Sequence, residues 1–227
     1  MSGRTQALGA LGVLGVLGML AMLAGCGSYT TYRTTRIAKP GQTEWLFGAQ
    51  ASGAIAQDDS TKQAAPLPEF AVAARRAVHD RVELQANATL FPIKAAPTGS
   101  LELAGKLRIG ARGRWSLAVG TGVGYRLAES GGATIEGVFA SVPVIAGIEL
   151  GRHQLVVSVA AGYQRWYASG AHPVGIPFVG DSVGFLWQVG RHWALLPEAG
   201  VAWSPTPNFM TEDSRLFHVG IAALWTR

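Results

Sequence analysis

The residues that could do acid–base chemistry are five histidines and a few acidic side chains. A histidine beside a carboxylate is a common general acid–base pair, and two pairings are conceivable near the longer polar breaks, His172 with Asp181 and His218 with Glu212. The other histidines fall in short polar breaks, where solvated corner residues are usual: His79, His153 and His192. No His-Glu-x-x-His sequence occurs, so a zinc-binding helix of that type is not indicated. We therefore expect no catalytic site, no metal and no cofactor.

A single cysteine, Cys26, follows an N-terminal apolar run. One thiol excludes a disulfide within the chain and a metal cluster held by several thiolates. The run from Ala7 to Ala24 is uncharged and follows a basic start at Arg4, which is the layout of a secretory signal. A retained membrane-spanning helix is the alternative reading of a run this long, although its repeated glycines weaken it as a permanent helix.

The sequence Leu-Ala-Gly-Cys at 23–26 resembles the lipobox of bacterial lipoproteins. The resemblance implies that residues 1–25 are removed as a signal peptide and that Cys26 then carries covalent lipid, with palmitate among its acyl chains. Gly27 stands where an aspartate would resemble an inner-membrane retention signal. The resemblance therefore favours sorting to the outer membrane.

The rest of the chain divides into a short tether and one domain. Residues 26–42 are rich in threonine, serine and glycine and offer no face long enough to pack, which predicts a tether. Residues 43–227 are enough for a single domain with a sizeable core. The net charge of +5 comes without a basic run interleaved with aromatic residues, so no nucleic-acid partner is expected.

One sequence pattern occurs three times in the domain. It reads GRWSLAVGTGVGY at 113–125, GRHQLVVSVAAGY at 151–163 and GRHWALLPEAGVAW at 190–203, with starts 38 and 39 residues apart. Apolar residues alternate within each copy with a period of two, which is typical of a strand with two different faces. Each copy therefore reads as a hairpin corner followed by a strand.

Period-two segments continue along the whole domain, and the breaks between them are alternately short and long. An even number of antiparallel strands, with short turns at one rim and longer loops at the other, is the layout of a transmembrane β-barrel. The fold class predicted is thus all-β, an antiparallel transmembrane β-barrel of about ten strands, with eight as the alternative if the first pair is poorly formed. The expected strands are 43–56, 69–76, 82–91, 99–110, 115–127, 135–150, 154–168, 177–189, 193–204 and 214–226.

Aromatic residues mark both ends of several strands. Trp115 and Tyr125 are ten residues apart, as are Trp193 and Trp203, and ten tilted strand residues span about 25 Å, the height of a lipid-facing apolar band. Tryptophan and tyrosine favour the two membrane interfaces because they bury an apolar ring and keep one polar atom wet. The expected interface residues are Trp115, Tyr125, Tyr163, Trp193, Trp203 and Trp225.

Polar and charged residues share the opposite face with many glycines. Lys106 and Arg108 alternate with leucines, and a basic side chain on the lipid face would cost about 2–4 kcal/mol near the membrane midplane. We therefore expect a narrow lumen filled by paired charges. The candidates are Arg75, Glu83, Glu102, Lys106, Arg108, Glu198 and His218.

A soluble lipocalin-like barrel alternates in the same way, with its apolar face inward around a ligand. A periplasmic or surface lipoprotein that binds an apolar ligand is therefore the alternative function. Pro143 and Pro197 lie inside expected strands, and since a closed barrel has no edge strand to accommodate a missing N–H, bulges or local breaks are expected there.

The function expected is that of an outer-membrane lipoprotein of a Gram-negative bacterium with a structural, interaction or minor pore role and no evident catalysis. Its partners would be the lipid bilayer and the lipid on Cys26. The alternating last strand ends close to Trp225 and resembles the signal read by the barrel insertion machinery, which implies that machinery as a partner during assembly. The N-terminus is expected on the periplasmic side.

Overall fold

The computed structural model describes residues 32–55, 66–92, 98–130, 133–168, 172–205 and 215–227. The predicted signal peptide, residues 1–25, and the predicted lipidation site, Cys26, lie outside these residues. Ten strands form a single closed antiparallel barrel in which each strand pairs with its sequence neighbours and the first pairs with the last. The strands are β1 (Thr43–Ile55), β2 (Leu67–His79), β3 (Val82–Phe91), β4 (Thr98–Arg112), β5 (Trp115–Ser130), β6 (Ala133–Leu150), β7 (His153–Ala168), β8 (Val174–Gln188), β9 (Trp193–Trp203) and β10 (Arg215–Thr226).

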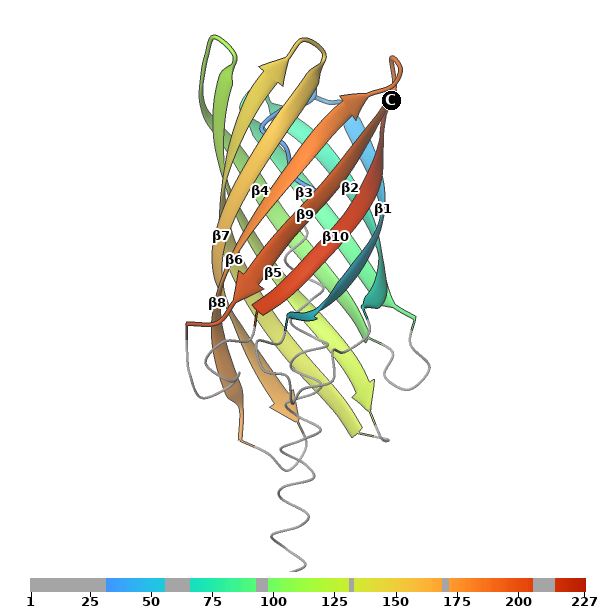
Figure 1. The fold of residues 1–227 in the computed structure, drawn as a ribbon, viewed down its shortest axis with the longest axis vertical. Coiled ribbons are helices and arrows are strands. Elements are labelled where there is room, and N and C mark those ends of the chain that lie inside the picture. The colour runs from blue at the N-terminus through green and yellow to red at the C-terminus, as the bar shows by residue number, and fades with distance from the viewer. Residues whose placement is uncertain (1–31, 56–65, 93–97, 131–132, 169–171, 206–214) are drawn as a thin grey trace, which may run out of the picture.

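The barrel confirms the predicted fold class and selects ten strands over eight. Every predicted strand is present, and most differences are extensions of a strand end by one to three residues. The short turns β2–β3, β4–β5, β6–β7 and β8–β9 lie together at one rim, with the C-terminus beside them (Figure 1). We call this end the short-turn rim and the opposite end the loop rim.

The seam between β1 and β10 closes the sheet without a free edge. Its register runs from Glu44 opposite Thr226 to Ile55 opposite Arg215, and continuous pairing of this kind satisfies the backbone groups that an edge strand would leave open. No helix with the length and hydropathy of a membrane span occurs in the described residues.

The two prolines inside strands coincide with interruptions in the ladder. Between β5 and β6 the pairs stop at Val119–Val144 and resume at Gly122–Ser141, on either side of Pro143. Between β8 and β9 they stop at Gly184–Glu198 and resume at Trp187–Leu195, next to Pro197. The register is the same before and after each gap, so the missing N–H produces a local break and no bulge at either position.

One prediction about the first described residues is wrong. The expected tether, 26–42, includes Tyr32, Arg33, Thr34 and Thr35, which are each at most 3% exposed. These residues lie inside the barrel lumen, because the side chains they contact all come from the inner faces of the strands. Threonine-rich composition predicts an unpacked chain, but the Thr35 hydroxyl bonds to the Ser116 and Gln154 side chains of the lumen instead.

Candidate functional site

The candidate site is the lumen of the barrel together with the chain that passes through it. We call residues 32–36 the lumenal segment. The Tyr32 hydroxyl donates to the carbonyl oxygen of Ala49, halfway along β1, at 3.1 Å. Four residues later, Arg36 donates to the carbonyl oxygens of Arg152 and His153 in the β6–β7 turn, at 2.8 and 2.9 Å. The segment therefore runs from the middle of the lumen to the short-turn rim, where β1 begins.

Tyr32 sits against positions that have no side chain. A Cβ atom on Gly48 would lie 2.6 Å from the Tyr32 ring, a distance at which the ring would have to move. Gly220 faces the Tyr32 hydroxyl in the same way. On this side of the lumen the ring joins an apolar cluster contributed by β1, β2, β8, β9 and β10: Leu46, Ala71, Ala73, Leu186, Ala194, Leu196, Ala222 and Leu224.

Arg33 is buried on the opposite, polar side of the lumen. Its Nη2 lies 2.9 Å from Oε1 of Glu102 on β4, and the two side chains are only 2% and 7% exposed. Gly120 makes room for the guanidinium, since a Cβ atom there would lie 2.9 Å from Nη1. A buried charge without a partner is strongly destabilising, so this ion pair fixes the segment to β4.

Lys106 joins the lumenal segment to the barrel wall. Its ammonium lies 2.9 Å from Glu83 Oε1 and donates to the carbonyl oxygens of Thr34 and Arg36 at 2.9 and 2.7 Å. All three donor positions of the ammonium are thereby used. The lysine thus neutralises a wall carboxylate and holds the backbone of the segment at the same time.

Arg75 of β2 performs a similar double role nearer β1. It pairs with Glu44 at 3.1 Å and donates to the carbonyl oxygen of Tyr32. Backbone oxygens of Tyr32, Thr34 and Arg36 are therefore all bonded by side chains of the wall. An extended segment inside a pore has no neighbouring strand to pair with. These side-chain bonds satisfy its backbone oxygens instead.

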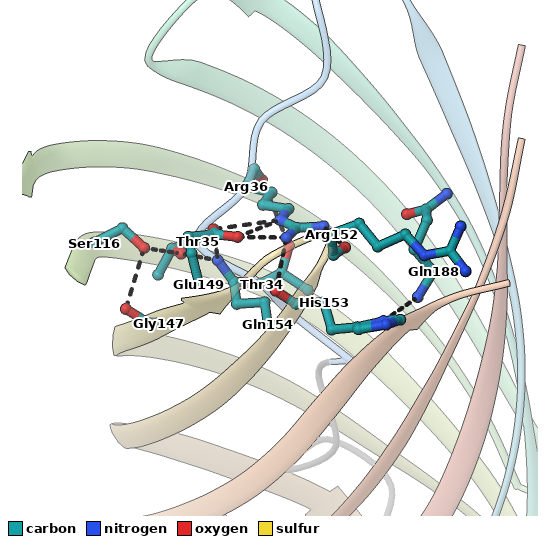
Figure 2. Close-up of polar contacts among 10 residues, drawn as sticks. All are labelled: Thr34, Thr35, Arg36, Ser116, Gly147, Glu149, Arg152, His153, Gln154 and Gln188. Atoms are coloured by element: carbon teal, nitrogen blue, oxygen red, sulfur yellow. Dashed lines mark hydrogen bonds and ion pairs between the residues drawn. The ribbon is translucent and has the colours of Figure 1, made fainter. Parts of the chain in front are cut away.

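At the short-turn rim the contacts become denser, as Figure 2 shows. The Thr35 hydroxyl lies 2.5 Å from the Ser116 hydroxyl and accepts from Gln154 Nε2 at 2.8 Å. Arg36 pairs with Glu149 at the end of β6. These bonds attach the segment to the barrel wall where it leaves the lumen.

The structure brings together four of the lumen residues expected from the sequence and separates the rest. Arg75, Glu83, Glu102 and Lys106 all contact the lumenal segment or its direct partners. Arg108 lies near the rim and donates to the carbonyl oxygen of Asp80 at 3.0 Å.

Glu198 and His218 form a second group on β9 and β10, with Glu198 Oε1 3.6 Å from His218 Nε2. Both side chains are less than 5% exposed. A further buried cation of the lumen, Arg126, lies over the rings of Phe139 and Trp166 at 5.3 and 5.7 Å.

The outer face carries the aromatic residues expected at the interfaces. Trp115 is 62% exposed and Tyr125, ten residues along the same strand, is 42% exposed. On β9, Trp193 and Trp203 are 47% and 37% exposed. Tyr163 is also exposed, and Trp225 packs against Trp193 with ring centroids 6.4 Å apart. Between these residues the outer face is a band of exposed valine, leucine and isoleucine.

The conceivable acid–base pairs are not assembled by the described residues. His172 is exposed in the loop before β8, whereas Asp181, expected at the same rim, lies within β8 and is exposed on its outer face. His218 faces Glu198 in the lumen, and Glu212 lies outside the described residues.

The three corner histidines lie at the short-turn rim. His79 is exposed at the end of β2, His153 Nδ1 accepts from the backbone N–H of Gln188 at 3.2 Å, and His192 Nδ1 lies 3.0 Å from the carbonyl oxygen of Thr226. No group of three or more metal-ligating side chains that could hold an ion occurs in the described part of the chain.

Sequence reasoning missed the lumenal segment, above all Arg33 and Thr35. The signal that could have found it is a set of inward glycines. A Cβ atom on each would collide with the segment: Gly48 and Gly220 with Tyr32, Gly120 with Arg33, and Gly147 with Thr35. The sequence predicts only a narrow lumen filled by paired charges, whereas the glycines at these positions accommodate a second stretch of the same chain.

Solved structures that align with this barrel include outer-membrane proteins of Gram-negative bacteria. The COG4313 outer membrane channel from Pseudomonas putida F1 aligns with a TM-score of 0.53 at 10% identity, covering 88% of this chain and 98% of that one. The translocator domain of the autotransporter NalP from Neisseria meningitidis aligns with a TM-score of 0.49 at 10% identity, covering 97% of each chain. No protein-family model matches the sequence, and no curated protein matches it either. The fold is that of an outer-membrane β-barrel.

The distribution of residues on the two faces contradicts the soluble alternative. A lipocalin-like barrel would enclose its tryptophans and valines around a ligand, but here Trp115, Val123 and Trp193 are among the exposed side chains. The lumen holds charged residues that are 7% exposed or less, including Glu83, Glu102 and Lys106. An apolar exterior and a polar interior are what a barrel in a bilayer requires.

Proposed function

We propose that the protein is an outer-membrane lipoprotein whose barrel is closed by its own lumenal segment, and that it serves as a membrane-held structural or interaction scaffold without catalysis. The observation that carries this proposal is the bonding of Lys106, which holds Glu83 and two backbone oxygens of the segment at once. A diffusing solute would have to break this contact and the Arg33–Glu102 pair beside it. Interaction would then take place at the loop rim, because surface loops are where such scaffolds carry recognition.

Conductance across a planar bilayer tests the closed lumen. The purified full-length protein is expected to give no steady ohmic conductance, whereas deletion of residues 27–40 should produce one. Gly48→Leu is a second variant that displaces Tyr32 without removing the segment, and it should raise the frequency of brief openings. Heat-modifiable migration on gels verifies that each variant is still a barrel. Steady conductance of the unmodified protein equal to that of the deletion would overturn the closed-lumen proposal.

Lipidation and membrane insertion are tested separately. The mass of the mature N-terminal peptide is expected to correspond to a diacylated or triacylated Cys26. Carbonate washing should leave a Cys26→Ala variant in the membrane, because the barrel itself is embedded. Release of that variant into the soluble fraction would show that the lipid alone holds the protein to the membrane.

A further inference from the structure

The short-turn rim carries exposed basic side chains around its whole circumference. Each of the four short turns (Figure 1), together with the strand ends that flank it, contributes at least one, and two more lie beside the β1–β10 seam. We call these residues the basic ring. Its members are Lys39, Arg76, Arg81, Arg112, Arg114, Arg152, Arg191 and Arg227, all of which are exposed.

The basic ring has little counter-charge within the protein. The carboxylates of Glu44, Glu83 and Glu149, which lie near this rim, are already paired with basic residues outside the ring. Asp80 is the one exposed acidic side chain in the four short turns. No member of the ring forms an ion pair with a described residue. Because like charges repel one another, an anion from outside the chain would bind here favourably.

The ring lies directly beside the tryptophans of the outer face. Arg112 pairs with Trp115 across the β4–β5 ladder, and since directly paired residues share a face of the sheet, Arg112 starts from the outer wall. Arg191 precedes Trp193, another exposed residue of the outer face, by two positions. Tryptophan favours the boundary between hydrocarbon and headgroups, and a long basic side chain beside it extends its charge toward the headgroups. The ring is therefore at the level of the lipid phosphates.

The opposite part of the outer wall has no comparable excess of positive charge. Toward the loop rim the exposed basic residues Arg165 and Arg215 share the described surface with exposed acidic residues, Glu129, Glu136 and Asp181. The positive charge is thus concentrated at one end of the barrel, where only one of the two leaflets can meet it.

The composition and shape of the ring favour lipid over a docked protein. Seven of its eight members are arginines, and a planar guanidinium binds phosphate through two parallel hydrogen bonds. The ring surrounds the barrel, as lipid headgroups do, whereas a protein docked on the outer wall would meet only one side of it.

We propose that the basic ring binds the phosphate groups of anionic phospholipids, such as phosphatidylglycerol, in the leaflet that meets the short-turn rim. Short turns of an outer-membrane barrel face the periplasm, so these lipids belong to the periplasmic leaflet. The inference goes beyond the proposed function, because it depends neither on a closed lumen nor on lipid at Cys26.

The lipids retained by the purified protein test this proposal. The protein is taken from vesicles of equal parts phosphatidylglycerol and phosphatidylcholine, and its bound lipids are counted by native mass spectrometry. Phosphatidylglycerol is expected in excess. Arg112→Gln combined with Arg191→Gln should lower the retained phosphatidylglycerol by about a quarter, because two of the eight cations are lost, and adding Arg114→Gln and Arg227→Gln should bring the loss to about a half.

Arg165→Gln combined with Arg215→Gln is the matched control. It removes two exposed basic residues of the outer wall that lie outside the ring, and it should leave the retained phosphatidylglycerol unchanged. Heat-modifiable migration on gels verifies that each variant is still a barrel. Raising the salt concentration from about 0.1 M to about 1 M shortens the screening length from about 10 Å to about 3 Å, so the excess of phosphatidylglycerol on the unmodified protein should fall.

Two results would overturn the proposal. One is equal retention of phosphatidylglycerol and phosphatidylcholine by the unmodified protein, which is the result expected if the ring instead binds an acidic protein. The other is an equal loss of phosphatidylglycerol in the ring variant and in the control, since the position of the charges would then be irrelevant. Neither result bears on conductance or on the mass of Cys26, so failure here is distinct from failure of the proposed function.

Discussion

The two faces of β4 show how differently one alternating pattern is used. Glu102 and Lys106 point inward, where each has a named partner at 2.9 Å. Leu101 and Leu103 point outward and are 65% and 68% exposed. The outer residues need only be apolar, because lipid packs against them whatever their shape, whereas the inner residues must match a particular donor or acceptor. A substitution on the inner face should therefore lower the free energy of unfolding by leaving a buried donor or acceptor unpaired. A substitution on the outer face should lower it only when it places a polar or charged group against lipid.

Glu102→Ala should have the largest effect, because it leaves the buried Arg33 guanidinium without its carboxylate. Breaking a buried ion pair costs about 3–5 kcal/mol. The measurement is the free energy of unfolding from urea titrations in lipid vesicles. Glu129→Ala, on the exposed part of β5, is the control and should change it little. A cost equal to that of the control would mean that the Arg33 charge is neutralised elsewhere.

Thr121→Arg should be next, since it places a charge on the outer face between the two interface aromatic residues of β5. Thr121 is exposed and lies six residues after Trp115 and four before Tyr125. A basic residue near the membrane midplane costs about 2–4 kcal/mol. Thr121→Leu should be neutral or stabilising by the same vesicle assay. An arginine tolerated without cost would place this surface in water.

Thr35→Val compares the two faces with one chemical change. It keeps the shape but removes a fully buried hydroxyl bonded to Ser116 and Gln154, and leaving those partners unsatisfied costs about 1–3 kcal/mol. Thr121→Val makes the same change on the outer face and should cost nothing measurable. An equal change in the free energy of unfolding for Thr35→Val and Thr121→Val would contradict the expectation that a hydroxyl matters only on the inner side of the barrel.

Asp181→Val should have the smallest effect, and of opposite sign. The Asp181 side chain is exposed on the outer face of β8, with Val159 and Val201 as its cross-strand neighbours. Acidic residues on a lipid-facing surface cost less than basic ones, so the expected gain is below about 2 kcal/mol. Destabilisation by this substitution would indicate that Asp181 is in contact with a partner in the membrane.

The sequence predicted the wall of the barrel well and its contents poorly. Alternation from Trp115 to Tyr125 predicts the strand and its two faces, because both follow from local geometry. That Lys106 and Glu102 face inward follows from the same parity. Their joint contact with residues 33–36 depends on a fold that brings together positions some 70 residues apart. Alternation carries no such information, and the threonines of this segment have the composition of an ordinary tether.

The seam between β1 and β10 determines when the lumen can be filled. The chain leaves the lumen at Arg36 and becomes β1 at Thr43, and β1 pairs with β10 along its whole length. Once that seam has formed, the flanking N-terminal residues could enter the lumen only by threading end-on through a ring already crowded with side chains. We therefore expect residues 32–36 to lie against the inner face of the growing sheet before β10 pairs with β1, so that the barrel assembles around this segment.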